Sequence, residues 1–310
     1  MESPIIVSLG EVLWDLFPEG ERFGGAPANF ACHAAILGAN VSMVSAVGGD
    51  RHGCEALDIL RDYGIDVSLM QTVSDAATGT VGVALDSAGK PNFTIHENSA
   101  WDRIKWSDEI EARVKETDAV YFGTLGQRSE VSRRTIRRCI DAARDAGIPR
   151  IVDINLRSPF FDNDLIRESI ELASILKLSD DELPEVSSAC GIHSSASPET
   201  LLRHLLESQN LDLVVMTCGA QGATLATPDG VVRQQGIQTQ VKDTVGAGDS
   251  FAAAFLLGLL RSEPHDQILH KACAIAAAAC SHSGAVLQQC VRETTNREVD
   301  RTTNTKGNRK

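Results

Sequence analysis

The sequence predicts an α/β fold with a mostly parallel central sheet, helices on both of its faces and a small additional β-sheet. Short runs rich in Val and Ile alternate with longer segments of helical character, and this alternation is typical of layered α/β proteins. The runs are almost continuously apolar, as strands covered on both faces usually are. With 43% hydrophobic and 23% charged residues among 310, the chain has an ordinary globular composition and enough length for one large core.

The predicted strands of the main sheet cover residues 5–9, 41–47, 119–123, 151–154, 174–178 and 213–217. The predicted helices cover residues 27–37, 53–63, 130–146, 198–208, 247–260 and 267–280. Ser197 followed by Pro198 is a strong helix start, because a serine hydroxyl caps the first amides and proline fits the first helical position. Parallel neighbours in such a sheet require right-handed crossovers.

Two extended segments fall outside this alternation and predict a small β-element beside the main sheet. Residues 80–85 and 92–96, joined by a glycine-containing turn at 87–90, are typical of a β-hairpin, and residues 12–17 are also extended in character. A second hairpin is expected around Pro228-Asp229-Gly230, a strong turn signal. From Arg292 onward apolar residues become rare, so residues 291–310 are expected to form a disordered tail.

Charge and cysteine content limit the partners and the compartment. The 29 Lys and Arg residues against 42 Asp and Glu residues give a net charge of −13, which opposes binding to nucleic acid or to an anionic membrane surface. The eight cysteines form no C-x-x-C pair, the first residues lack the basic start of a secretory signal, and no apolar run approaches the length of a membrane span. We therefore expect a reduced, cytoplasmic protein with neither a nucleic-acid nor a membrane partner.

The strongest motif runs from Asp243 to Phe251, where small residues lead directly into an apolar helical run. Gly246, Ala247 and Gly248 would let a bulky anion approach the unpaired amides of the first helical turn, where the helix dipole also favours negative charge. Asp249 would add repulsion there, which makes sense if its carboxylate takes a proton from a hydroxyl group during phosphoryl transfer. An acid in a first helical turn is also favourable without any catalytic role. The motif is neither a Rossmann fingerprint nor a P-loop.

Asp243-Thr244-Val245-Gly246-Ala247-Gly248-Asp249 resembles the C-terminal signature of the ribokinase-like (PfkB) carbohydrate kinases, and Gly24-Gly25-Ala26-Pro27-Ala28-Asn29 resembles their N-terminal signature. The two motifs occur in the expected order, and the resemblance covers almost the whole chain. Gly10-Glu11-Val12-Leu13-Trp14-Asp15 makes it most similar to the fructokinase group. The resemblance implies a ribokinase-like three-layer kinase domain at residues 1–290, with a β-sheet lid from residues 11–24 and 79–102 inserted in it.

The residues of the N-terminal motif suit a polyol. Gly24-Gly25 permits tight backbone approach, Asn29 can both donate and accept, and an ionised Asp15 can accept from two neighbouring hydroxyl groups. Taken singly, Asp15 or Asn29 could equally be a surface or capping residue. The resemblance places Asp15, Gly25 and Asn29 in the sugar site beside Asp249. The residues of the β-element that it implies over the sugar are Glu97, Asn98, Trp101 and Asp102, although Trp101 could equally serve packing.

Asp153-Ile154-Asn155-Leu156-Arg157 places polar groups where a buried strand ends, and ligands gather at such ends in open α/β sheets. The stretch is similar to the family's Asp-x-Asn-x-Arg, which implies that Arg157 approaches the transferred phosphate with its rigid fork of donors. A loop arginine paired with a surface acid is the alternative. Ser179-Asp180-Asp181-Glu182 has the spacing of a capping box. By position it matches the family's Asn-x-x-Glu, which implies that Glu182 helps to organise Mg²⁺ through water.

The resemblance also implies ATP and Mg²⁺ as cofactors, a nucleotide site and a cation site. The nucleotide-binding residues that it implies are Lys177, Ser179, Thr217, Gly219, Gly222 and Gly248. The main-chain oxygens that it implies for a monovalent cation such as K⁺ lie near Asp243, Val245, Ala279 and Gly284.

These motifs predict an ATP-dependent sugar kinase that phosphorylates a primary hydroxyl group of a small sugar, with fructose as the favoured substrate. Asp249 would act as the base, and the amides of Ala247, Gly248 and Asp249 together with Arg157 would stabilise the transferred group, under a lid that closes to exclude water. The same chemistry on 2-keto-3-deoxygluconate, ribose or a nucleoside is an alternative. So is a non-catalytic regulator that binds sugar and nucleotide, or, more remotely, a nicotinamide oxidoreductase. The resemblance also implies a homodimer formed through the β-lids.

Overall fold

The computed structural model describes residues 3–85, 91–192 and 195–286, and its centre is an eight-stranded sheet with the strand order β14-β13-β12-β11-β10-β9-β1-β4. Neighbouring strands from β12 to β4 are parallel, whereas β13 and β14 form an antiparallel hairpin at one edge. The strands of this sheet are β1 (Ile5–Leu9), β4 (Asn40–Val44), β9 (Ala119–Gly123), β10 (Arg150–Asp153), β11 (Ile175–Ser179), β12 (Leu213–Thr217), β13 (Gly222–Thr227) and β14 (Gly230–Gln235).

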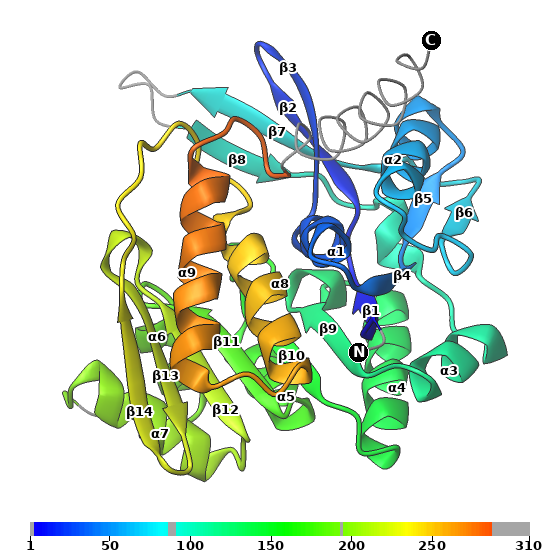
Figure 1. Cartoon of the computed structure of the whole chain (residues 1–310). Helices are drawn as coiled ribbons and strands as arrows, with labels where there is room; N and C mark the ends of the chain where they lie inside the picture. The colour runs from blue at the N-terminus through cyan, green and yellow to red at the C-terminus, as the bar shows by residue number, and fades with distance from the viewer. Residues whose placement is uncertain (1–2, 86–90, 193–194, 287–310) are drawn as a thin grey trace, which may run out of the picture.

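Helices cover both faces of this sheet (Figure 1). One face carries α1 (Ala26–Ile36), α2 (Arg51–Asp62), α8 (Ala247–Leu260) and α9 (His265–Cys280). The opposite face carries α3 (Asp108–Lys115), α4 (Glu130–Asp145), α5 (Asn163–Leu172), α6 (Leu183–Ala189) and α7 (Pro198–Ser208). Short 3₁₀ helices are η1 (Ala100–Arg103), η2 (Leu125–Gln127) and η3 (Gly219–Gln221). The predicted mostly parallel α/β fold is therefore confirmed.

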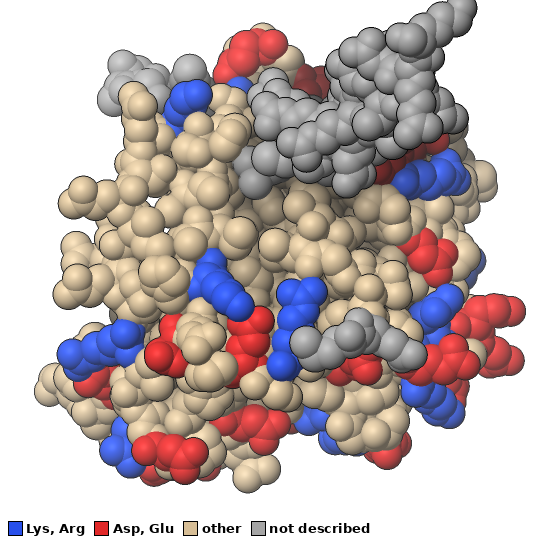
Figure 2. Space-filling view, in the orientation of Figure 1, with Lys and Arg blue, Asp and Glu red and all other residues tan. Residues whose placement is uncertain are grey.

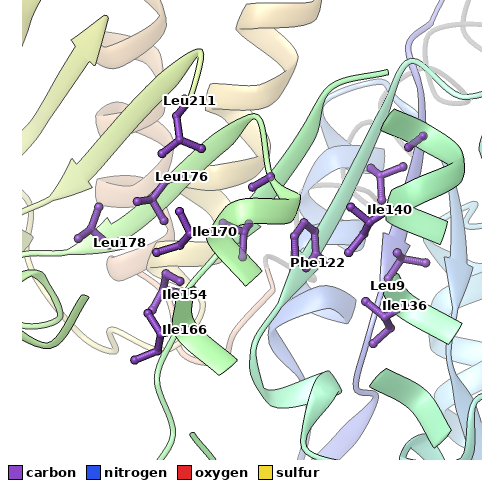
Figure 3. Packing of buried hydrophobic residues seen from close by; sticks show 14 of the residues in the cluster. Leu9, Phe122, Ile136, Ile140, Ile154, Ile166, Ile170, Leu176, Leu178 and Leu211 are labelled. Carbon is purple, nitrogen blue, oxygen red and sulfur yellow. The ribbon is translucent and has the colours of Figure 1, made fainter. Parts of the chain in front are cut away.

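The core consists of two hydrophobic clusters, one on each face of the sheet. Figure 3 shows the cluster beneath α4 and α5, where Phe122 of β9 and Leu176 of β11 lie among isoleucines of these helices. Each such side chain contributes about 1.5–3 kcal/mol by its burial. On the other face, α8 is buried almost all round, because it lies between α1, α9 and the sheet. This burial fixes the position of its first turn.

A second sheet of four strands stands beyond the main one in the order β3-β2-β7-β8 (Figure 1). It consists of β2 (Leu13–Phe17), β3 (Gly20–Gly24), β7 (Gly79–Leu85) and β8 (Pro91–Ile95). We call these four strands the lid sheet. The predicted hairpin and the extended segment at 12–17 both belong to it, and β3 adds a strand that was not predicted. The turn predicted at 87–90 and the tail predicted at 291–310 lie outside the described residues.

One predicted strand proves to be two. The run at 41–47 divides into β4 and β5 (Ala46–Gly48), and β5 pairs instead with β6 (Gln71–Val73) in a separate two-stranded sheet. Continuous apolar character cannot reveal this change of partner, because both strands are buried. The hairpin predicted around Pro228-Asp229-Gly230 is confirmed as β13 and β14.

The face of the molecule drawn in Figure 2 carries charges of both signs. Figure 2 shows Lys and Arg interspersed with Asp and Glu over the lower part of the face in view. The seven cysteines within the described ranges are all free. In the part of the chain that the structure describes, no helix has the length and apolar character needed to cross a membrane.

Candidate active site

The N-termini of α1 and α8 meet at the edge of the main sheet where its parallel strands end. Ligands of open α/β sheets collect at this edge. Asn29 of α1 donates a hydrogen bond of 2.9 Å from Nδ2 to Oδ2 of Asp249 in the first turn of α8. The two motifs that the sequence places far apart therefore form one site.

Gly246 closes the back of this site. It has the left-handed backbone conformation, with φ of 77°, and a side chain there would overlap the carbonyl oxygen of Ala285. The two constraints together explain why this position needs glycine. The turn aims the amides of Gly248 and Asp249 out of the helix end, where they lack partners within the helix and can bind an anion, whereas the Ala247 amide donates to the Thr244 carbonyl oxygen at 3.3 Å.

Asp249 is half-buried and ionises less readily than an exposed aspartate. Its pKa is raised from 3.8 to about 6, mainly by loss of hydration and in second place by the nearby charge of Asp153. The hydrogen bond from Asn29 and the charges of Lys177 and Arg157 oppose this rise. At neutral pH the carboxylate is therefore mostly ionised, yet its pKa lies closer to the working pH than usual, which suits a proton acceptor.

A buried ion pair lies beneath the first turn of α8. Lys177 Nζ is 2.8 and 2.7 Å from the two carboxylate oxygens of Asp153, and Tyr121 donates its hydroxyl to the same carboxylate at 3.0 Å. Burial lowers the pKa of Lys177, but attraction and hydrogen bonds to Asp153 outweigh it, so the net pKa is raised and the ammonium group stays charged. Its Nζ is 3.6 Å from the position that a Gly248 side chain would occupy. The ammonium group of Lys177 thus lies close to Gly248 in the first turn of α8, where the transferred phosphate is expected.

Arg157 is exposed, and its guanidinium donates to the carbonyl oxygen of Leu156 at 3.0 Å. Its charge partly offsets the burial that raises the pKa values of Glu11, Asp15 and Asp249, so Arg157 lies near all three carboxyl groups. The surface ion pair that was the alternative for Arg157 is not seen among the described residues. Arg157 is therefore available to an incoming anion.

The sugar side of the site is built from the lid sheet and the start of α1. Asp15 lies on β2 opposite Arg22 of β3, and burial raises its pKa to about 6 against the charges of Arg157 and Arg22. Gly25 has φ of 106° and lies against the backbone of Glu11, so a side chain would not fit there. These placements bring Asp15, Gly25 and Asn29 to one side of Asp249.

The predicted residues after β8 are placed less uniformly. Asn98 is exposed with φ of 57°, and no hydrogen bond or ion pair in the described ranges joins it to Asp15 or Asp249. Glu97 is also exposed. Trp101 is fully buried, and Asp102 is buried in an ion pair with Arg128 at 2.8 Å. The expectation of a sugar contact is therefore wrong for these two residues, which pack beneath the lid sheet instead.

Glu11 is a site residue that the sequence motif contained but did not single out. It is 3% exposed, and burial raises its pKa from 4.5 to about 7. Its Oε2 is buried without a hydrogen-bond partner among the described residues, as is Oδ1 of Asn29. Unpaired buried acceptors in a binding site are positions where a donor is expected. Only the tertiary structure reveals them.

A cavity of about 600 Å³ opens on the other side of the α8 mouth. Four of the predicted nucleotide residues line it, namely Thr217, Gly219, Gly222 and Gly248. Its apolar wall includes Phe251 of α8 and Ala276 and Ala277 of α9. This combination of an apolar wall with a polar mouth fits the base and phosphates of a nucleotide. The alanines of α9 carry no motif, so sequence reasoning missed them.

Glu182 holds the loop that carries Arg157. Its carboxylate accepts hydrogen bonds from the Leu156 amide at 2.7 Å and from the amide and hydroxyl of Ser179 at 2.8 and 2.9 Å. Only half of the predicted capping box forms: the Glu182 carboxylate accepts from the Ser179 amide, but α6 begins after Glu182 and the Ser179 hydroxyl donates to Glu182 instead of capping the helix. Ser179 was predicted to bind the nucleotide, but it is not among the residues that line the 600 Å³ cavity.

The carboxylate of Glu182, near Lys177 and Asp153, has oxygen ligands that suit Mg²⁺ held through water. Three or more His, Cys, Asp or Glu side chains placed to hold a metal ion are not found within residues 3–85, 91–192 and 195–286.

The predicted cation-site residues come together around Asp243. Its Oδ1 accepts from the Val245 amide at 3.1 Å, and its Oδ2 accepts from the Gly284 amide at 3.0 Å and from Arg22 at 3.2 Å. The Ala279 carbonyl oxygen accepts the His282 amide at the end of α9. Asp243 thus links the lid sheet, the α8 motif and the segment after α9.

Comparison with known proteins places these features in a family. Residues 18–290 match the model of the pfkB family carbohydrate kinases. The probable fructokinase-5 of Arabidopsis thaliana is 29% identical over 275 residues, which are 83% of this chain and 83% of that protein.

Two crystal structures resemble the whole fold. An uncharacterized sugar kinase from Pyrococcus horikoshii in complex with ATP has a TM-score of 0.76 and 28% identity, covering 90% of this chain and 93% of that one. The aminoimidazole riboside kinase of Salmonella enterica, complexed with aminoimidazole riboside and an ATP analogue, has a TM-score of 0.77 and 25% identity, covering 94% and 99%. The two signatures, their meeting at Asn29 and Asp249, and the match over residues 18–290 show that the chain belongs to the pfkB family of carbohydrate kinases, which are phosphotransferases with an alcohol group as acceptor.

Proposed function

We propose that the protein is an ATP-dependent kinase of a small neutral sugar, with fructose as the first candidate. The observation that carries the proposal is the hydrogen bond between Asn29 and Asp249 at the open mouth of α8. It places a carboxylate of raised pKa between a polyol-binding motif and an anion-binding helix end. The relatives named fructokinase and the ATP-bound neighbour support the same choice.

In the proposed reaction Asp249 accepts the proton of a primary hydroxyl group as its oxygen attacks the γ-phosphorus. The new bond joins that oxygen to phosphorus, and the bond between the γ-phosphorus and the bridging oxygen breaks to release ADP. The amides of Ala247, Gly248 and Asp249 stabilise the oxygens of the transferring group, with Arg157 on its exposed side. Such positioning and charge stabilisation supply most of the rate in phosphoryl transfer.

The nucleotide is proposed to lie in the 600 Å³ cavity, with its base against Phe251 and Ala277. Its phosphates would then reach Lys177 and the α8 amides. Mg²⁺, held by phosphate oxygens and water near Glu182, would supply charge neutralisation between the phosphates. The glycine-lined mouth leaves room for phosphates because Gly248 has no side chain.

The charges around the sugar side support a neutral substrate over an acid sugar. Three carboxyl groups face this space, from Glu11, Asp15 and Asp249. The cation nearest to Asp15 on the lid sheet, Arg22, is already paired with Asp243 at 3.2 Å. The other cation that acts on these carboxyl groups, Arg157, is assigned to the transferred phosphate in the proposed reaction. A carboxylate on the sugar would therefore meet repulsion with little compensation, which disfavours 2-keto-3-deoxygluconate.

A riboside or nucleoside is the second candidate, because the aminoimidazole riboside kinase of Salmonella typhimurium has the same 29% identity to this chain as the probable fructokinase-5. An ADP-release assay with fructose, ribose, aminoimidazole riboside, adenosine and 2-keto-3-deoxygluconate separates these choices. The highest kcat/KM is expected with fructose. Saturable sugar binding without ADP release from any of them would favour the non-catalytic regulator instead.

A further inference from the structure

Arg128 is a buried arginine outside every motif described above. Its side chain is 6% exposed and follows η2, directly after β9. The guanidinium lies over the ring of Trp101 at 3.9 Å on one side and over the ring of Phe160 at 4.6 Å on the other. A planar guanidinium is suited to stacking between two rings, and such contacts contribute most where water is excluded.

One edge of the guanidinium is also held by hydrogen bonds, whereas Nη1 is buried without a partner among the described residues. Nε and Nη2 each donate to one carboxylate oxygen of Asp102 at 2.8 Å, and Nη2 also donates to the carbonyl oxygen of His96 at 2.7 Å. Asp102 is itself 6% exposed. Breaking a desolvated pair of this kind leaves an uncompensated buried charge, so both partners stay in one place.

The groups that contact Arg128 belong to two separate segments that border the candidate site, the base of the lid sheet and the loop of Arg157. His96 directly follows β8, and Trp101 packs against Gly79 at the start of β7. These are the two strands by which the lid hairpin leaves the body of the protein. Phe160, on the other side, belongs to the loop of Arg157, because its amide donates to the Arg157 carbonyl oxygen at 2.8 Å.

We propose that Arg128 is a positioning residue that connects the base of the lid sheet to the loop of Arg157. The inference rests on the proposed function, in which Arg157 approaches the transferred phosphate. Glu182 fixes one end of that loop through the Leu156 amide, and the stack of Phe160 on Arg128 fixes the other. Movement of the lid base would then be transmitted to Arg157 through one side chain.

A lysine at position 128 can keep one contact with Asp102, but it cannot stack as a plane between two rings or bind Asp102 and His96 together. Arg128→Lys is therefore expected to lower kcat by about tenfold to a hundredfold through misplacement of Arg157. Arg157→Ala should lower kcat as well. In the double variant, Arg128→Lys should change kcat by less than about twofold, because its effect passes through Arg157.

The double-mutant cycle on kcat, measured by ADP release with saturating sugar and ATP, tests this inference. Arg150→Lys is the matched control: Arg150 also donates to backbone carbonyls, but at the opposite end of β10, and its effect should add to that of Arg157→Ala. If Arg128→Lys does not fold, as judged by Tm and circular dichroism, Phe160→Leu takes its place in the cycle with the same expectation.

The outcomes distinguish a failure of the inference about Arg128 from a failure of the proposed role of Arg157. Additive effects of Arg128→Lys and Arg157→Ala, in folded proteins, would show that Arg128 only stabilises the fold and would overturn the inference. An Arg157→Ala variant with unchanged kcat would instead contradict the role of Arg157 in the proposed function. Non-additive effects with additive behaviour of Arg150→Lys would support a connection through Arg128.

Discussion

Asn29 and Asp249, 220 positions apart in the chain, are joined by one hydrogen bond of 2.9 Å between the first turns of α1 and α8. The amide nitrogen of Asn29 is used in this bond, whereas its oxygen has no partner among the described residues. Asn29 therefore orients the carboxylate of Asp249 and keeps an acceptor free for a substrate hydroxyl group. This hydrogen bond couples Asp249, the proposed base, to Asn29, the proposed sugar-binding residue.

Asp249→Asn should lower kcat by about 10²–10⁴-fold, because the amide cannot accept the proton of the attacking hydroxyl group. Binding of sugar and nucleotide should persist, as measured by isothermal titration calorimetry. Asp266→Asn is the control, since Asp266 is an exposed acid in the first turn of α9 and should retain full turnover. A variant Asp249→Asn with near-normal kcat would remove Asp249 from its role.

The pH dependence of kcat/KM should follow the ionisation of Asp249. The base acts only when ionised, and its pKa is raised to about 6, so activity should fall as the pH drops through about 6. The hydrogen bond from Asn29 lowers this pKa, and Asn29→Ala should therefore move the acid limb to higher pH. Asn163→Ala, at the exposed start of α5, should leave the limb in place. A limb that Asn29→Ala does not move would contradict the assignment.

The nucleotide cavity can be tested on two neighbouring alanines. Ala277 lines the cavity, whereas Ala278 is exposed and points elsewhere. Ala277→Phe should fill the space proposed for the base and raise the KM for ATP by about tenfold, the equivalent of ~1.4 kcal/mol. The KM for sugar should change little, and Ala278→Phe should leave both values near those of the parent. Equal effects of the two substitutions on ATP would argue against this location.

Glu11 should make stability depend on pH in an unusual direction for an acid. Burial raises its pKa from 4.5 to about 7, so the folded protein binds this proton more tightly than the unfolded chain does. Ionisation of Glu11 then lowers the free energy of unfolding as the pH rises from 4.5 to about 7, by up to ~3 kcal/mol.

Glu11→Gln removes this titration, and its Tm should rise relative to that of the parent as the pH increases through the same window. Differential scanning fluorimetry from pH 4.5 to 8 measures the difference. Glu116→Gln, at an exposed acid after α3, should follow the parent throughout. The same pH trend for Glu11→Gln and the parent would show that Glu11 does not ionise in a buried position.

The fold was largely predictable because its strands and long helices carry strong local signals. The run at 119–123 and the helix at 247–260 appear with the bounds expected from their apolar residues. Elements with weak local signals were missed. β3 has few apolar residues and exists because it pairs with β2, and α3 buries only Ile110 and Val114 over eight residues.

The candidate site was predictable where a motif brings several functional residues together, as around Asp249. It was not predictable where function depends on contacts between distant segments. The burial of Glu11, the cavity wall from α9 and the stack of Phe160 on Arg128 all arise from tertiary packing. Asp102 shows the converse, since its position in the chain suggested a sugar contact, whereas its partner Arg128 keeps it beneath the lid sheet.

The side-by-side packing of α1 and α8 has a consequence for the order of synthesis. The motif at residues 24–29 leaves the ribosome first, whereas the glycine turn at Gly246 and the carboxylate of Asp249 emerge more than two hundred residues later. A chain that ends before Gly246 thus carries the N-terminal motif but lacks the carboxylate proposed to act as the base. Measured turnover would therefore report the fraction of molecules in which the two motifs have come together.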